Sequence, residues 1–162
     1  MALRKQRADI VSLTGDAIKE MEPLVADGRA ITFDPPATEV WAEVDRDRYT
    51  IVVRNLISNA VKYSPAGSDV SIRVVPNGKL ASVLVTDKGV GIAKEDQARL
   101  FTRFGRIENS ATRHTAGTGL GLWLSREIAR MHDGDLKVDS AVGAGSTFTL
   151  EIPIDSADRN KT

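Results

Sequence analysis

A chain of 162 residues, of which 41% are hydrophobic and 27% charged, has the size and composition of one globular domain. It contains no cysteine, which excludes disulfides, thiolate nucleophiles and cysteine-zinc sites. Its 22 basic and 22 acidic side chains balance, which argues against a nucleic-acid partner. Because there is no signal peptide and no apolar run long enough to cross a membrane, we expect a soluble, cytoplasmic domain.

The first part of the chain predicts two helices with two short strands between them. Apolar residues at helical spacing predict a helix over residues 9–27. Strands are expected at Ala30–Phe33 and Val40–Val44, joined by a turn at Asp34-Pro35-Pro36. A long helix is expected at Arg46–Tyr63, because turn-forming residues follow directly after it.

The second part predicts strand pairs on either side of a long irregular segment. Alternating apolar residues predict a hairpin over residues 70–85. Residues 87–121 are rich in glycine and charge, which in a compact domain is typical of a lid. A helix and two strands are expected after this segment, at residues 120–131, 136–140 and 147–152. Such strand pairs predict an α+β fold, a two-layer sandwich whose mostly antiparallel sheet has three main helices on one face.

Two asparagines mark one face of the long helix. Asn55 and Asn59 are four residues apart, so they lie one turn apart on the same, partly buried face. An unpaired polar group there costs about 1–3 kcal/mol, so both amides need partners. Amide oxygens are hard ligands that suit Mg²⁺ together with phosphate oxygens. Taken alone, however, the pair is better explained as two asparagines on a helix surface.

Three segments with glycines follow in order. In Asp87-Lys88-Gly89-Val90-Gly91-Ile92, after a strand, the carboxylate can accept a hydrogen bond from an amine and the glycines let backbone approach a ligand. Gly117–Leu122 leads into a helix, whose first N–H groups attract phosphate. Gly143–Phe148 leads into the last strand. Each segment taken alone could equally be a turn or a linker.

The ordered set, together with Leu100–Arg106, resembles the N, G1, F, G2 and G3 boxes of the catalytic domain of sensor histidine kinases. This resemblance implies the Bergerat α/β sandwich, a fold shared with DNA gyrase B, the Hsp90-type chaperones and the MutL repair proteins. It divides the chain into a residual linker from an upstream acceptor domain at residues 1–8, the catalytic, ATP-binding domain at 9–153 and a flexible tail at 154–162.

The resemblance also implies a site for ATP and Mg²⁺. Asn59 would coordinate Mg²⁺ on the phosphates, with Asn55 beside it. The residues implied to hold the adenine are Tyr63, Asp87, Gly89, Gly91, Ile92 and Thr147. Those implied to hold the phosphates are Lys62, Arg106, Gly117, Thr118, Gly119, Leu120, Gly121 and Leu122. Phosphoryl transfer would depend on Asn55, Asn59, Lys62 and Arg106, under an ATP lid at about residues 93–116.

By resemblance the chain is a protein histidine kinase domain that donates the γ-phosphoryl group of Mg-ATP to a histidine on a separate dimerisation domain. A response regulator would then act downstream in two-component signalling. The related gyrase and chaperone ATPases have a glutamate where this chain has Asn55, and an asparagine cannot accept a proton from water at neutral pH. We therefore expect the site to hold ATP without hydrolysing it quickly.

Two departures from the family pattern bear on this interpretation. Gly105 stands where the family has a bulky residue, which is expected to loosen the lid. Neither His114 nor His132 is followed by the acidic residue and Leu-Arg of an acceptor helix, so the acceptor is expected in another part of the parent protein. His114 would lie in the lid, and His132 near a helix C-terminus, where a partial positive charge is tolerated.

Two alternative functions stay open at this point. One is a stand-alone serine kinase of the same fold, like the anti-sigma-factor kinases, and the other is a non-catalytic module that senses nucleotide. The chain itself is expected to be a monomer and its parent a homodimer. Whether the parent is anchored in the cell membrane is left open by the sequence.

Overall fold

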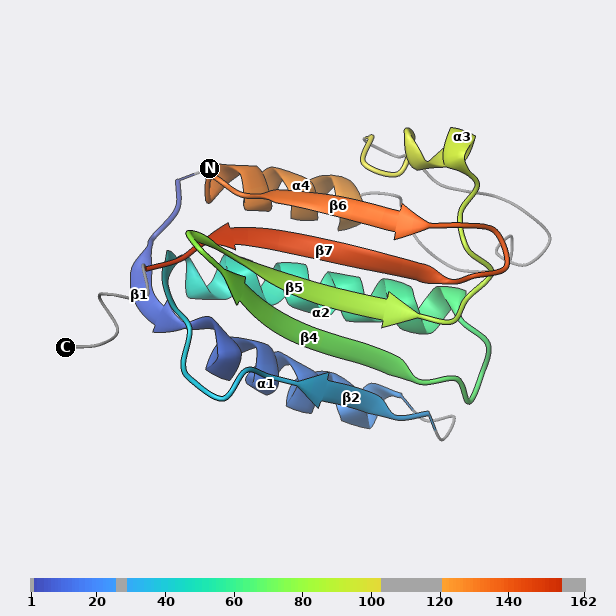
Figure 1. Ribbon diagram of the computed structural model, residues 1–162, viewed down its shortest axis with the longest axis horizontal. Coiled ribbons are helices and arrows are strands. Elements are labelled where there is room, and N and C mark those ends of the chain that lie inside the picture. The colour runs from blue at the N-terminus through green and yellow to red at the C-terminus, as the bar shows by residue number, and fades with distance from the viewer. Residues whose placement is uncertain (1, 26–28, 103–120, 156–162) are drawn as a thin grey trace.

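A five-stranded sheet with helices on one of its faces forms the body of the protein (Figure 1). The computed structural model describes residues 2–25, 29–102 and 121–155. The strands lie in the order β2 (Ile31–Asp34), β4 (Val70–Asn77), β5 (Leu80–Asp87), β7 (Ser146–Pro153) and β6 (Asp135–Ser140). Strands β2 and β4 are parallel, and the other neighbours are antiparallel. This mixed sheet confirms the predicted α+β class.

Three main helices form the second layer, which confirms the predicted two-layer sandwich. They are α1 (Ile10–Met21), α2 (Arg46–Tyr63) and α4 (Gly121–Met131), with α2 between the other two and behind the sheet in the view of Figure 1. The described residues also form two single helical turns, η1 (Glu22–Leu24) and α3 (Lys94–Gln97). Over the three described ranges, no helix is long and apolar enough to span a membrane.

Helix α2 is the central helix of the core. It begins at Asp45, whose side chain accepts a hydrogen bond from the N–H of Arg48 at 3.1 Å, and it ends before Pro65, which disfavours helical backbone in the residue preceding it. Its buried side chains are Tyr49, Val52, Val53, Leu56, Ile57 and Ala60. Each large apolar side chain buried this way contributes about 1.5–3 kcal/mol. This packing fixes the rotation of α2 and therefore the position of its polar residues.

Strand β3 (Trp41–Val44) does not belong to the main sheet. It pairs antiparallel with β1 (Gln6–Asp9) in a separate two-stranded sheet, while β2 pairs with β4. The predicted pairing of residues 30–33 with residues 40–44 through a tight turn is therefore wrong. Pro35 and Pro36 follow β2 directly, and neither has the N–H that continued pairing requires.

Two predicted boundaries also differ from the structure. Residues 6–8, predicted as linker, form most of strand β1, although the division of the parent protein into domains stays a prediction. The helix predicted over residues 9–27 ends at Met21 and continues only as the single turn η1. Pro23 explains the early end, because proline lacks the N–H of a helix interior and its ring clashes with the preceding turn.

Strand β1 is fastened at the end of the sheet where β7 finishes (Figure 1). The N–H of Arg4 donates to Asp45 Oδ2 at 3.0 Å, and this hydrogen bond is the main reason why the pKa of Asp45 is lowered. The guanidinium of Arg7 pairs with Asp155 at 2.9 Å and lies 4.6 Å from the centre of the Trp41 ring. The first strand and the second residue after β7 are thus held together.

Candidate active site

Asp87 is the last residue of β5, and its side chain is buried at the end of the sheet with 6% of its surface exposed. Its Oδ1 atom accepts a hydrogen bond from the N–H of Gly89 at 2.8 Å. Burial raises the pKa of the carboxyl, and the N–H groups of Gly89 and Ser146 offset part of that rise. A buried carboxylate at a sheet end can accept a further hydrogen bond from a ligand amine.

Gly89 and Gly91 bring this loop against two other parts of the fold. A β-carbon on residue 89 would collide with the carbonyl oxygen of Tyr63, at the end of α2. Gly91 has φ of +76°, and a β-carbon there would collide with the carbonyl oxygen of Ala141. Both positions therefore require glycine. The structure brings Asp87, Gly89 and Gly91 together with the half-buried Tyr63, as the sequence predicts.

Ser140, at the end of β6, joins the loop after β5 to the turn before β7. Its hydroxyl accepts a hydrogen bond from the N–H of Ile92 at 2.8 Å, donates to the carbonyl of Gly145 at 2.8 Å and lies 2.8 Å from the hydroxyl of Ser146. Gln97 adds hydrogen bonds to the carbonyls of Ile92 and Ser140, both at 2.9 Å. Ser140 could not be predicted from the sequence, because a serine at a strand end has no distinctive local signal.

Replacing Ser140 with alanine should loosen both loops at once. The N–H of Ile92 would lose its acceptor, so the free energy of unfolding should fall by about 1–3 kcal/mol. Affinity for a nucleotide bound at Asp87 should fall as well, since Ser146 would lose its hydroxyl partner. Chemical denaturation and calorimetric titration with ATP measure the two effects, with Ser71→Ala on β4 as the control. Unchanged stability in Ser140→Ala would contradict this account.

Ser146, and not Thr147, lies beside Asp87. In the antiparallel register of β5 and β7, Asp87 pairs with Ser146 and Thr86 pairs with Thr147. The Thr147 hydroxyl is 3.0 Å from that of Thr86, on the opposite face of the sheet from Ser146. The structure therefore places Ser146, rather than Thr147, on the same side of the sheet as Asp87. The strict alternation along β7 could have identified Ser146, which shares the buried face of Phe148.

Helix α2 carries four predicted site residues toward the loop of Asp87. Asn55 and Asn59 are half-buried, Lys62 is exposed, and Tyr63 ends the helix next to Gly89. The Nδ2 atom of Asn55 donates a hydrogen bond to the hydroxyl of Ser125 on α4 at 3.1 Å. Sequence analysis did not single out Ser125.

Phe101 links the end of the described α3 region to α4 and the sheet. Its ring meets that of Phe148 edge-on, with 6.4 Å between centres and 82° between planes. On another side the guanidinium of Arg126 lies 4.8 Å from the centre of the Phe101 ring, within the range of a cation–π contact. The first residue of the predicted F box, Leu100, is buried in the core.

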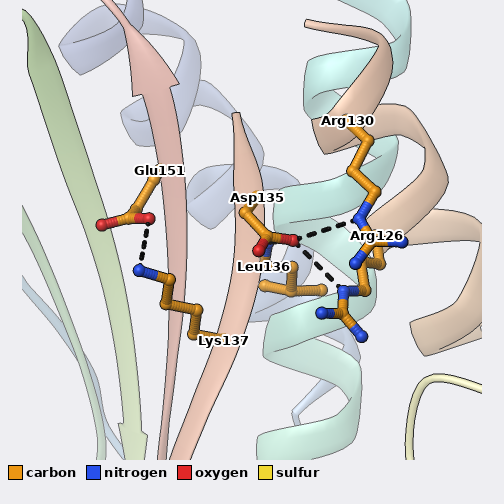
Figure 2. Close-up of polar contacts among 6 residues, drawn as sticks. All are labelled: Arg126, Arg130, Asp135, Leu136, Lys137 and Glu151. Atoms are coloured by element: carbon orange, nitrogen blue, oxygen red, sulfur yellow. Dashed lines mark hydrogen bonds and ion pairs between the residues drawn. The ribbon is translucent and has the colours of Figure 1, made fainter. Parts of the chain in front are cut away.

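Asp135 holds α4 against β6 through two arginines, as Figure 2 shows. Its Oδ1 atom accepts a hydrogen bond from Arg126 Nε at 3.1 Å and pairs with Arg130 Nε at 3.4 Å. Burial alone would raise the pKa of Asp135, but the N–H of Leu136 and the two guanidinium groups hold it below its usual range. Arg126 thus connects the Phe101 ring to a fixed point on the sheet.

His132 follows α4 directly and is buried, with 3% of its surface exposed. Its Nε2 atom accepts a hydrogen bond from the N–H of Asp45 at 3.0 Å, and its Nδ1 atom is 2.8 Å from the carbonyl oxygen of Ile128. With Nε2 accepting, Nδ1 is the ring nitrogen that donates to the carbonyl oxygen of Ile128. The predicted place near a helix C-terminus is confirmed.

Several predicted site residues lie outside the described part of the chain. They are Arg106, Gly117, Thr118, Gly119 and Leu120, together with Phe104, Gly105, His114 and most of the predicted lid. Gly121 and Leu122 are described, and they form the first residues of α4. The phosphate-binding role of all these residues stays a prediction.

Residues 44–156 match the family of histidine kinase-, DNA gyrase B- and HSP90-like ATPases. The match includes α2, the loop of Asp87 and the last two strands, and it spans more than half of the chain. The chain therefore belongs to this family of ATPase domains.

The relatives place it more narrowly, among the catalytic domains of sensor histidine kinases. The sensor-like histidine kinase SenX3 of Mycolicibacterium smegmatis is 40% identical over 146 residues, which are 90% of this chain and 38% of that protein. The mycobacterial sensor histidine kinase MprB is 25% identical with a TM-score of 0.79, over 94% of this chain and 99% of that one. Full-length ShkA in complex with AMPPNP is 25% identical with a TM-score of 0.81, and the match covers 97% of this chain and 32% of that one.

These findings confirm the resemblance to sensor histidine kinases, and the domain is the catalytic ATPase part of such a kinase. The chain spans well under half of the length of SenX3.

Proposed function

We propose that this domain binds Mg-ATP and donates the γ-phosphoryl group to a histidine on a separate dimerisation domain of its parent protein. The buried carboxylate of Asp87, held at the end of β5 beside the end of α2, is the observation that carries this proposal. The structural likeness to ShkA, which was solved with the ATP analogue AMPPNP, supports it. A response regulator would receive the phosphoryl group afterwards.

The described residues fit an adenine nucleotide. Asp87 would accept a hydrogen bond from the adenine amine, and Tyr63 would pack on the ring. Gly89 and Gly91 let this loop pack closely against the backbone of Tyr63 and Ala141, which holds the Asp87 carboxylate in position for the base. Ser146 supports the carboxylate through its N–H group, in the place that was predicted for Thr147.

The donor set on α2 fits a phosphate group with its metal ion. Asn59 would supply an amide oxygen to Mg²⁺, which binds hard oxygen ligands and usually keeps several waters. When bound, the ion supplies positive charge that stabilises the transferring phosphoryl group. Asn55 lies one turn away, and Lys62 would reach the phosphates from the end of the helix, where Arg106 and residues 117–122 would complete the site.

Affinity for ATP should depend on Mg²⁺ through Asn59. Calorimetric titration of the chain with ATP should give clearly weaker binding when a chelator removes Mg²⁺, because phosphate charges then lack their counterion. In Asn59→Ala, the gain in affinity on adding Mg²⁺ should shrink, since a ligand of the metal is missing. The same substitution at an asparagine outside the proposed site is the control: Asn77→Ala, on β4, should keep the full gain in affinity on adding Mg²⁺. Affinity indifferent to Mg²⁺ in the unaltered chain would remove Asn59 from the proposed metal site.

A transfer assay separates this proposal from kinase activity on serine. Label moved from ATP to a histidine-bearing acceptor domain should be lost in acid, because phosphohistidine is acid-labile. Label that survives acid would point to a hydroxyl acceptor instead.

A further inference from the structure

We infer that Ser125 is a positioning residue, which fixes the orientation of the Asn55 side-chain amide for the transfer reaction. The inference rests on the proposed function, because it assigns to Asn55 a part in transfer. The first observation is that the polar side chain of Ser125 occupies a buried position among apolar residues. Ser125 is fully buried, with 0% of its surface exposed, and shares the inward face of α4 with Ile128 and Ala129.

A hydroxyl in such a position costs free energy unless it has a hydrogen-bond partner. The partner is the Asn55 amide on the neighbouring helix α2, whose Nδ2 atom lies 3.1 Å from Ser125 Oγ. An alanine would fill the same place without that cost. The serine is therefore explained by its contact with Asn55 rather than by packing.

In the structure the NH₂ end of the Asn55 amide makes this contact, which leaves the oxygen end for a ligand. An asparagine side chain has one donor end and one acceptor end of nearly the same shape, so packing alone distinguishes them poorly. Because Nδ2 donates to Ser125, the Oδ1 atom is the end that remains. An NH₂ group turned toward a metal ion would bring like partial charges together, whereas an oxygen can accept a hydrogen bond from a metal-bound water or from the entering nucleophile.

The position of the two residues fits this role. Ser125 lies four residues, about one turn, after Gly121, where α4 begins within the predicted phosphate-binding segment Gly117–Leu122. Asn55 lies one turn before Asn59 on α2, and α2 packs directly against α4. The hydrogen bond therefore joins the two helices that carry the proposed phosphate and metal ligands, about one turn from those ligands on each helix.

A double-mutant cycle tests the inference with label transfer to an added acceptor-helix domain. At saturating Mg-ATP, Ser125→Ala should slow transfer about five- to tenfold, the size expected for one lost hydrogen bond, with Mg-ATP affinity changed less than about twofold. In an Asn55→Ala background, Ser125→Ala should change the rate less than about twofold, because its effect runs through the missing amide. Equal slowing in both backgrounds would overturn the inference.

The matched control removes a different buried hydroxyl from the contacts of α2. Tyr49 is 1% exposed, and its hydroxyl lies 2.7 Å from that of Thr14 on α1. Tyr49→Phe should lower the melting temperature at least as much as Ser125→Ala does, yet leave the transfer rate within about twofold, since this bond does not touch Asn55. If Tyr49→Phe slows transfer as much as Ser125→Ala, the effect is general loosening of the helices and the inference is wrong.

A measurement without nucleotide keeps the inference separate from the proposed function. In a ¹⁵N–¹H spectrum of the whole chain, the side-chain NH₂ pair of Asn55, identified by its absence in Asn55→Ala, should shift in Ser125→Ala and stay in place in Tyr49→Phe. An unshifted pair overturns the inference whatever the transfer assay gives. If the unaltered chain binds no ATP, the proposed function fails, and the shift alone decides whether Ser125 fixes the amide. If Asn55→Ala transfers at the normal rate, Ser125 positions nothing for the reaction and the inference is overturned.

Discussion

Asp87→Asn should weaken the binding of ATP and ADP by about 1.5–3 kcal/mol, or roughly 10- to 150-fold, with the fold intact. The carboxylate is a charged acceptor for the adenine amine, and such hydrogen bonds are worth more than neutral ones. An asparagine can turn its NH₂ group toward the base and oppose the adenine amine with a second donor. Calorimetric titration with both nucleotides measures the loss.

The same substitution should leave thermal stability unchanged or raise it. Burial raises the pKa of Asp87, which means that the folded state holds the carboxylate at a cost that asparagine does not carry. The amide oxygen of asparagine can still accept the N–H of Gly89. A collapse of the melting temperature, together with normal nucleotide binding by the molecules that remain folded, would make Asp87 a structural residue instead.

The raised pKa of Asp87 also predicts the direction in which nucleotide affinity changes with pH. Asp87 is the stronger, charged acceptor for the amine only when it is ionised, so nucleotide affinity should fall as the pH drops through its folded-state pKa. Because that pKa is raised, the fall should begin at a higher pH than for an ordinary aspartate. The contribution of Asp87 to folding stability runs the opposite way, since a raised pKa means that the folded state binds the proton more tightly and gains stability as the pH falls. In Asp87→Asn both trends should disappear.

The 162-residue chain should not phosphorylate itself, yet it should phosphorylate an acceptor-helix domain supplied in trans. His132 cannot serve as the acceptor, because it is 3% exposed and both of its ring nitrogens are in hydrogen bonds. It also follows the last residue of α4, while the predicted phosphate-binding segment lies at the start of that 11-residue helix, about 16 Å away. Transfer requires a nucleophile within roughly 3–3.5 Å of the phosphorus atom.

Two incubations with labelled ATP, one with the chain alone and one with the acceptor domain added, give the answer. Transfer in trans should be slow, since an untethered acceptor lacks the effective concentration that a linker provides. His114→Ala is the deciding control, because His114 is the other histidine of the chain. Acid-labile label on the chain alone that disappears in His114→Ala would show that the acceptor lies within this domain after all.

Sequence alone predicted the elements whose signal is local. The long helix at Arg46–Tyr63 has the bounds predicted for it, because a capping aspartate precedes it and Ser64-Pro65 ends it. The hairpin of β4 and β5 follows from alternating apolar residues on two adjacent runs. In both cases the residues that define the element are neighbours in the chain.

Local sequence patterns could not predict which strands pair when the strands are distant in the chain. Strand β2 pairs with β4, where Val70 lies 39 positions after its partner Ile31, and β3 pairs with β1, where Val44 lies 38 positions after its partner Gln6. Alternation in a short strand shows which side chains share a face, but carries no information about the strand that will lie beside it.

The same distinction between local and distant contacts applies to the residues of the candidate site. Asp87, Gly89 and Tyr63 could be predicted because each is part of a recognisable motif, and the structure brings them together. Ser125 and Ser140 could not, since a serine becomes informative only when its hydrogen-bond partners on other elements are known. The choice between Ser146 and Thr147 lay within reach, because it depends only on counting alternate residues back from Phe148.

Because β1 is attached to one end of the sheet, a rotation of the domain about β1 displaces the opposite end of the sheet most. Arg7 and Asp155 lie at one end of the sheet, and Asp87 lies at the other (Figure 1). The eight residues of β7 run between these ends, and at about 3.3 Å per residue they span about 26 Å. A rotation of about 30° around β1 would therefore carry Asp87 through about 13 Å, with no change inside the sheet. A rotation at the β1 end is thus converted into a large displacement of the Asp87 end, where the proposed nucleotide site lies.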